Sequence, residues 1–238
     1  MLHPSIFPFL EELRENNNRD WFKDNKHKHD AARAHVLQFT QDLFERLSDE
    51  NQLDGQKVFR VYRDVRFSKN KTPYKSHFGI GFHRIKPQFR GGYYLHLEPE
   101  ASFFGAGFWG PNKDDLFRVR KEIEMDHEYF EKMATDRKLT QTWGAMKGDQ
   151  LKTAPKGFYK EHPGINNLRF KQYIFTKDIP DELLFDANFE QWMIDHFNTI
   201  RPFLNYMSDV LTSDLNGESI LLNPTSKGLH NGKIKMYL

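Results

Sequence analysis

The stretch that decides the fold alternates apolar and other side chains: Tyr74-Lys75-Ser76-His77-Phe78-Gly79-Ile80-Gly81-Phe82-His83-Arg84-Ile85. Successive side chains of a β-strand point to opposite faces. The apolar members therefore share one face: Phe78, Ile80 and Phe82. The residues that alternate with them share the other face: Lys75, His77, Gly79 and Gly81. This period of two predicts a half-buried strand over 74–85.

A second alternating stretch follows after a hairpin loop at 86–92. Its apolar set would face the core together with the first: Tyr93, Leu95 and Leu97. Its other face would carry Tyr94, His96 and Glu98. Strands are also predicted at 57–64 and at 101–109, where Gly105 and Gly107 alternate with larger residues. Short connections of this kind favour an antiparallel meander.

Helical periodicity lies on both sides of these strands. Apolar residues recur at three- and four-residue steps over 4–15, from Asn18 to about 48, over 111–136 and over 189–211, and a further strand is predicted at 168–175. The order predicts an α+β fold: a mostly antiparallel sheet of about five strands with helices packed on one face. We expect one domain over 1–212 and a C-terminal tail or peripheral segment over 213–238.

Composition narrows the classes of protein and of site. The chain has 238 residues and no cysteine, which excludes disulfides, thiolate catalysis and cysteine-ligated zinc. No apolar run approaches the ~20 residues of a membrane-spanning helix, so we expect no membrane association. Residues 1–9 lack the pattern of a secretory signal. These features together predict a cytoplasmic protein.

Charge is concentrated around the predicted strands. Residues 57–90 contain ten Lys or Arg and one acid, Asp64, although the whole chain has a net charge of only +2. This asymmetry is typical of a surface for phosphates, carboxylates or nucleic acid. It is equally consistent with cations that pair with acidic helices elsewhere in the fold.

The open face of the sheet is the predicted site. Arg forks and Lys ammonium groups suit a phosphate or carboxylate, so five residues are predicted anion contacts: Arg60, Arg63, Arg66, Lys71 and Lys75. Tyr94 and Trp109 are predicted as walls, and Asp64 is expected to orient an arginine. Candidates for proton transfer, if the protein is an enzyme, are His77, His96 and Glu98. Parity does not decide which face of 57–64 joins this site.

Three alternatives remain open at this point. His77, His96 and Glu98 could supply metal ligands, but the local positive charge opposes a cation, so we expect neither a metal nor a cofactor. The basic, aromatic stretch 57–94 could bind nucleic acid by stacking bases and holding phosphates. The domain could also be a structural or interaction module without catalysis.

Several separated segments resemble a known family, the domain of unknown function 2461. They include Asn17 to Phe22, Arg60 to Ser68, Lys71 to Lys75, Gly92 to Pro99 and Gly105 to Trp109, in that order along the chain. The resemblance extends from about residue 5 to about residue 210. It implies a single α+β domain with no established activity, and it leaves the chemistry of the site open.

Overall fold

The structure is a computed structural model, which describes residues 1–221. Its helices are α1 (Ile6–Glu15), α2 (Arg19–Asp24), α3 (Lys26–Asn51), α4 (Lys113–Met125), α5 (His127–Ala134), α6 (Arg137–Trp143), α7 (Ile165–Leu168), α8 (Asp181–Leu184) and α9 (Phe189–Thr212). Its strands are β1 (Leu53–Val58), β2 (Phe78–Arg84), β3 (Gly92–Leu97), β4 (Phe103–Phe108) and β5 (Tyr173–Asp178).

The strands form one sheet in the order β1-β2-β3-β4-β5, and every neighbouring pair is antiparallel. In the register of β2 and β3, Ile80 lies opposite Leu95 and Gly81 lies opposite Tyr94. Residues directly opposite each other point to the same face. The two apolar sets therefore share one face, and the predicted α+β fold with an antiparallel sheet is confirmed.

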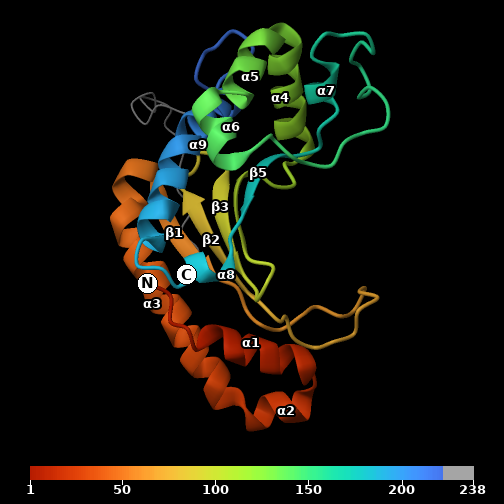
Figure 1. Cartoon of the computed structure of the whole chain (residues 1–238). Coiled ribbons are helices and arrows are strands. Elements are labelled where there is room, and N and C mark those ends of the chain that lie inside the picture. The colour runs from red at the N-terminus through yellow and green to blue at the C-terminus, as the bar shows by residue number, and fades with distance from the viewer. Residues whose placement is uncertain (222–238) are drawn as a thin grey trace, which may run out of the picture.

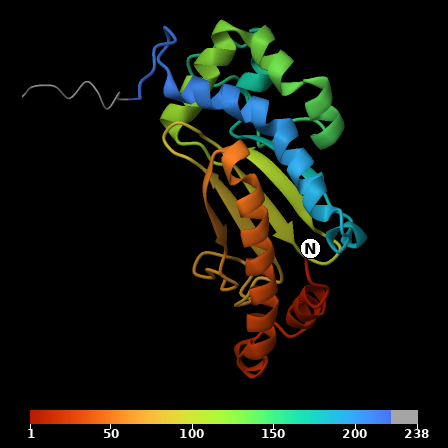
Figure 2. The same cartoon turned by 90° about the vertical axis from the view of Figure 1, so that its left-hand side faces the viewer.

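Helices α3 and α9 cover the apolar face of the sheet (Figures 1 and 2). Phe197 of α9 lies at the centre of this core. Its ring centroid is 3.9 Å from that of Tyr93 and 5.2 Å from that of Phe104, and all three residues are buried. Aromatic contacts of this kind bury large areas and stabilise a specific packing. The other face of the sheet is therefore free to carry the polar residues.

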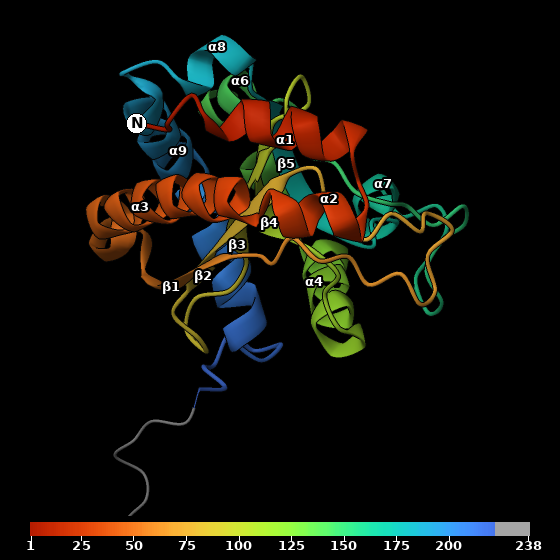
Figure 3. The ribbon, with the colours of Figure 1, turned by 90° about the horizontal axis from the view of Figure 1, so that it is seen from below.

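The N-terminal helices lie at one end of the sheet, beside the first half of α3 (Figure 3). Asn18 caps α2, because its side-chain oxygen accepts a hydrogen bond of 2.9 Å from the backbone N–H of Trp21. Phe22 of α2 stacks on Tyr74 with 4.0 Å between ring centroids. This contact attaches the helical end of the molecule to the segment that enters β2.

The strands predicted at 57–64 and 74–85 have different boundaries in the structure. The ladder with β2 ends after Phe59, whose N–H donates to the carbonyl of Gly79. The chain then extends as a long loop (Figure 1), which is narrowed by the isolated bridge between Tyr62 and Tyr74. Pro73 has no N–H to donate but accepts from Arg63. Alternation alone did not reveal that residues 60–77 leave the main sheet.

Two further boundaries differ from the sequence prediction. The helix predicted over 111–136 is divided at Asp126, whose side chain caps α5 by accepting from the N–H of Tyr129. The predicted strand at 168–175 begins only at Tyr173. At Asp126 a local polar side chain ends the helix, whereas before Tyr173 the backbone pairs with the segment 149–151 instead of with the sheet.

Helix α9 ends at Thr212, the position at which we placed the end of the domain. The first residues of the predicted tail turn back through a bridge between Ser213 and Ser219. Arg118 of α4 donates to the carbonyls of Ser213 and Asp214. The remainder of the predicted tail, 222–238, lies outside the described residues. None of the helices within 1–221 combines the length and apolar character needed to cross a membrane.

Candidate functional site

Glycines on the open face of the sheet make room for two large aromatic side chains. A Cβ atom on Gly79 would stand 2.6 Å from the hydroxyl oxygen of Tyr94. A Cβ atom on Gly105 would stand 2.9 Å from the ring of Trp109. Separations this short are incompatible with a side chain unless the aromatic residue moves. The glycines therefore allow Tyr94 and Trp109 to lie across the sheet.

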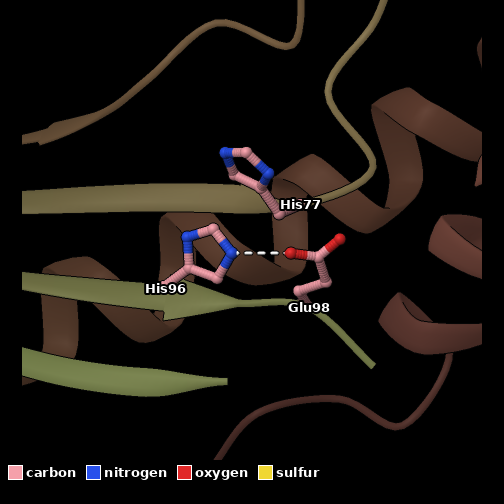
Figure 4. A group of neighbouring side chains, drawn as sticks. All are labelled: His77, His96 and Glu98. Atoms are coloured by element: carbon pink, nitrogen blue, oxygen red, sulfur yellow. Dashed lines mark hydrogen bonds and ion pairs between the residues drawn. The ribbon is translucent and has the colours of Figure 1, made fainter. Parts of the chain in front are cut away.

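A polar cluster of His77, His96 and Glu98 lies where β2 begins and β3 ends (Figure 4). The imidazoles of His77 and His96 have ring centroids 4.1 Å apart. Nε2 of His96 is 2.9 Å from Oε2 of Glu98. His77 comes from the residue before β2, and Glu98 from the residue after β3. The antiparallel register brings these three predicted residues together, although His96 and Glu98 follow His77 by 19 and 21 positions in the sequence.

Two hydroxyl groups complete the cluster. The hydroxyl of Tyr94 lies 3.2 Å from Nδ1 of His96, and Ser76 donates to Oε1 of Glu98 at 3.1 Å. Both ring nitrogens of His96 and both oxygens of Glu98 therefore have a polar neighbour. Partners on both sides of an imidazole fix its orientation. The cluster is an ordered arrangement, with the His96 side chain only 12% exposed.

The ionisation states follow from burial and from the neighbouring charges. Burial raises the pKa of Glu98, but the hydrogen bonds from His96 and Ser76 and the charges of both histidines outweigh it, so the pKa lies below its ordinary value. Burial and the charge of His96 lower the pKa of His77 to about 4, against the attraction of Glu98. Glu98 is therefore a carboxylate and His77 a neutral imidazole near neutral pH.

Three of the predicted cations lie near one another beside this cluster. Backbone hydrogen bonds of Arg63 to Pro73 and of Lys75 to Val61 pair their two segments, and both residues are half-buried, whereas Arg60 is exposed. Burial, and then the charges of Arg60 and Arg63, lower the pKa of Lys75. The charges of Lys75 and Arg63 in turn lower the pKa of His77. Within residues 1–221, no carboxylate whose side chain is described lies at ion-pair distance from any of these three cations. The Nε atom of Arg63 is buried without a hydrogen-bond partner among the described residues.

The other two predicted cations are engaged within the exposed loop. Arg66 donates to both carboxylate oxygens of Asp64, at 3.0 and 2.7 Å, so Asp64 orients an arginine as expected. The ammonium group of Lys71 donates to the carbonyl of Val65 at 2.9 Å. The structure therefore separates the predicted anion contacts into an inner group (Arg60, Arg63 and Lys75) and an outer pair (Arg66 and Lys71).

A cleft of about 670 Å³ adjoins the cluster on the same face of the sheet. Its walls include Tyr94 and Trp109, together with Phe59 and Phe103. Lys86 and Arg90 contribute cations, although Arg90 is paired with Asp115. The ring centroid of Tyr94 lies 6.5 Å from the ring centroid of Trp109 and 6.1 Å from that of His96. Tyr94 is therefore the wall shared by the cleft and the polar cluster.

Some residues of this site were not identified from the sequence. Phe103 lies on the open face, opposite His96 in the register of β3 and β4. Alternation could have identified it, because it precedes Gly105 by two residues. Ser76 gave no such signal, because the segment before β2 is not a regular strand and does not obey strict alternation. Phe59 belongs to the set of residues in 57–64 whose face was left open; it lies on the site face, next to Gly81.

The same cluster has the composition of a metal-binding group. One donor atom from each of His77, His96 and Glu98 lies within 4.8 Å of the other two. Imidazole nitrogen and carboxylate oxygen are common ligands of zinc and other first-row transition metals. The site can therefore serve proton transfer, hydrogen bonding to a ligand, or metal coordination.

Comparison with protein-family models matches residues 5–206 to a family described as "Conserved hypothetical protein (DUF2461)". This range contains every residue of the polar cluster and of the cleft. No curated protein and no solved structure matches the chain.

Proposed function

The chain belongs to the DUF2461 family, and we propose that it binds a small anionic ligand, bearing phosphate or carboxylate, on the open face of its sheet. The observation that carries the proposal is that Arg63 and Lys75, on two backbone-paired segments and with Arg60 nearby, form no ion pair with a carboxylate in the described part of the chain. Arg63 and Lys75 are partly buried, whereas Arg60 is exposed. Like charges held close together in a partly buried place are costly unless an anion joins them. A ligand phosphate or carboxylate would supply that missing charge.

The neighbouring cleft supports a ligand larger than the anion itself. Its volume of about 670 Å³ lies within the usual range for small-molecule sites, and its walls include Tyr94 and Trp109. In this proposal the anionic group lies near Lys75 and Arg63, while an apolar or planar part contacts the aromatic walls. Arg66 and Lys71 remain predicted contacts, but they have a weaker part because their side chains have partners within the loop.

The test is a binding screen with inorganic phosphate, pyrophosphate, nucleoside monophosphates and citrate, read as thermal stabilisation and then as dissociation constants. Arg63→Ala and Lys75→Ala should each weaken binding by about 10- to 100-fold, since a hydrogen bond to a charged group contributes about 1.5–3 kcal/mol. Arg66→Ala and Lys71→Ala are matched controls, because they remove the same charge from the exposed loop. The proposal fails if no anion of the panel stabilises the protein, or if all four variants bind equally well.

The outer pair also distinguishes the second candidate function, binding of nucleic acid by the basic and aromatic stretch 57–94. An exposed loop with cations and Phe67, which is 97% exposed, offers contacts to a strand of nucleic acid. In that case Arg66→Ala and Lys71→Ala should weaken binding at least as much as the inner variants. Arg63 and Lys75 are partly buried, which favours the small anion.

Proton transfer by His77, His96 and Glu98 stays a prediction, as does the use of the domain as a structural or interaction module. The sequence also leads us to place the protein in the cytoplasm. The proposed anion binding depends on none of these three assignments.

A further inference from the structure

The geometry of the polar cluster leads to a different role for its residues. We propose that His77, His96 and Glu98 bind one divalent transition-metal ion, of the zinc or iron(II) class, with at least one coordination position left open. This proposal concerns the metal alone and does not rest on the proposed anion binding. It reverses our expectation from the sequence that the local positive charge excludes a metal.

The donor atoms are close to the spacing that a metal requires. Zinc binds imidazole nitrogen at about 2.0–2.1 Å and carboxylate oxygen at about 2.0–2.2 Å, so two ligand atoms at a tetrahedral angle are about 3.3 Å apart. Nε2 of His96 and Oε2 of Glu98 are 2.9 Å apart, and the three donor atoms lie within 4.8 Å of one another. Loading therefore needs donor shifts of at most about 1.5 Å, which small side-chain rotations supply.

The surroundings of the donors match those of known metal ligands. A ligating histidine usually has a hydrogen-bond partner on its second nitrogen, and a ligating carboxylate on its second oxygen. Here the Tyr94 hydroxyl lies at Nδ1 of His96, and Ser76 donates to Oε1 of Glu98. The atoms left for a metal are Nε2 of His96 and Oε2 of Glu98, which face each other, with the ring of His77 beside them (Figure 4).

Two protein histidines and one carboxylate do not fill a coordination sphere. A tetrahedral ion would keep one further position and an octahedral ion three, which is typical of sites that bind or activate a ligand and not of closed structural sites. With one carboxylate, a divalent ion leaves the cluster with a net charge of +1, next to Lys75 and Arg63. An anion in the open position would neutralise this charge. The neighbouring cations would therefore favour an anionic group in the open position of the bound metal.

The test is a titration of the full chain with Co²⁺ and with Zn²⁺, after treatment with a chelator and without added phosphate or carboxylate. One equivalent of Co²⁺ should give visible absorption typical of four- or five-coordinate cobalt, and one equivalent of Zn²⁺ should displace it. His77→Ala, His96→Ala and Glu98→Gln should each weaken Co²⁺ binding by at least about 100-fold. Tyr94→Phe should weaken Co²⁺ binding by about tenfold, because it removes the hydroxyl that lies at Nδ1 of the ligand His96.

His83→Ala is the matched control, because His83 lies in β2, the strand that begins directly after His77, and on the same sheet face, but is exposed. It should bind Co²⁺ like the wild type. If a ligand variant fails to fold, the wild-type protein still decides: paramagnetic broadening by Co²⁺ must affect the ring protons of His77 and His96 and spare those of His83. The proposal is overturned if the folded wild type takes up no stoichiometric Co²⁺ or Zn²⁺, or if the His83→Ala variant loses as much affinity as His77→Ala. Anion binding measured in the presence of chelator tests the proposed function separately.

Discussion

The side-chain amide of Asn17 makes two hydrogen bonds with the backbone of Tyr74, donating to its carbonyl at 3.0 Å and accepting from its N–H at 3.1 Å. Asn17 lies in the turn between α1 and α2, 57 residues earlier in the chain. Its amide therefore makes the two hydrogen bonds that a neighbouring strand would make with Tyr74, in a segment that lies outside the sheet. Lys75 and His77 follow directly and depend on this attachment for their position.

We expect Asn17→Ala to lower the free energy of unfolding by about 1–3 kcal/mol, because it leaves both backbone groups of Tyr74 without their partners. Asn17→Asp should be less harmful, since a carboxylate still accepts from the N–H of Tyr74. Denaturant unfolding measures both. Asn16→Ala is the control, because the Asn16 side chain bonds to Glu12 within its own helix. Equal losses at the two positions would contradict the assigned role of Asn17.

Gly79→Ala should displace Tyr94, whose hydroxyl stands where the new methyl group would be. We expect a loss of about 1–3 kcal/mol in the free energy of unfolding, the usual result of overpacking. The loss should be smaller in a Tyr94→Phe background, which measures the coupling of the two sites in a double-mutant cycle. In Gly81→Ala, by contrast, the new methyl would meet atoms only at 3.5 Å and beyond, so this variant should be tolerated.

Stability should fall steeply at alkaline pH. Burial is the main cause that raises the pKa of Tyr93, Tyr173 and Tyr206 in the folded protein. Unfolded tyrosine ionises near pH 10, so the stabilisation is fully present below about pH 10 and is lost as pH rises above it, by about 1.4 kcal/mol per pH unit for each tyrosine.

This alkaline dependence can be measured by unfolding between pH 9 and 11 and by tyrosinate absorption. The matched variant is Tyr93→Phe. The hydroxyl of Tyr93 is buried without a hydrogen-bond partner in the part of the chain that the structure describes, so its removal should cost little at neutral pH. The variant should then lose stability less steeply above pH 10. An unchanged slope would show that Tyr93 is not protected by the fold.

The salt dependence of binding should be shallow for the proposed small anion. A nucleic-acid complex loses affinity with a slope of about −0.9 per phosphate neutralised, and a contact over the whole basic loop would involve several phosphates. We expect the dissociation constant of the best small anion to rise less than about tenfold between 50 and 200 mM salt, since a few contacts release few counterions. A steep slope for oligonucleotides, without binding of any small anion, would favour the alternative function.

Much of the fold was accessible from the sequence because the sheet has a period of two. The alternation around Phe78 and around Leu95 required both apolar sets to face one core, and this requirement placed His77, His96 and Glu98 on the opposite face. Parity could not show that residues 60–77 leave the main sheet, because the hydrogen bonds that hold Tyr74 come from Asn17, a distant residue.

The sequence by itself determined the α+β class, the antiparallel strands and the residue types on the open face, since these depend on local periodicity and on burial of the apolar side chains. Only the tertiary structure decided which cations converge and which donors meet. Arg63 and Lys75 lie near His77, whereas Arg66 turns to Asp64, although all of them belong to one basic stretch. The position of a charged residue in the sequence does not show where its side chain points in the folded protein. The side-chain positions in the site depend on the strand register and on the glycines that let Tyr94 lie across the sheet. They also depend on the hydrogen bonds from Asn17 that hold Tyr74.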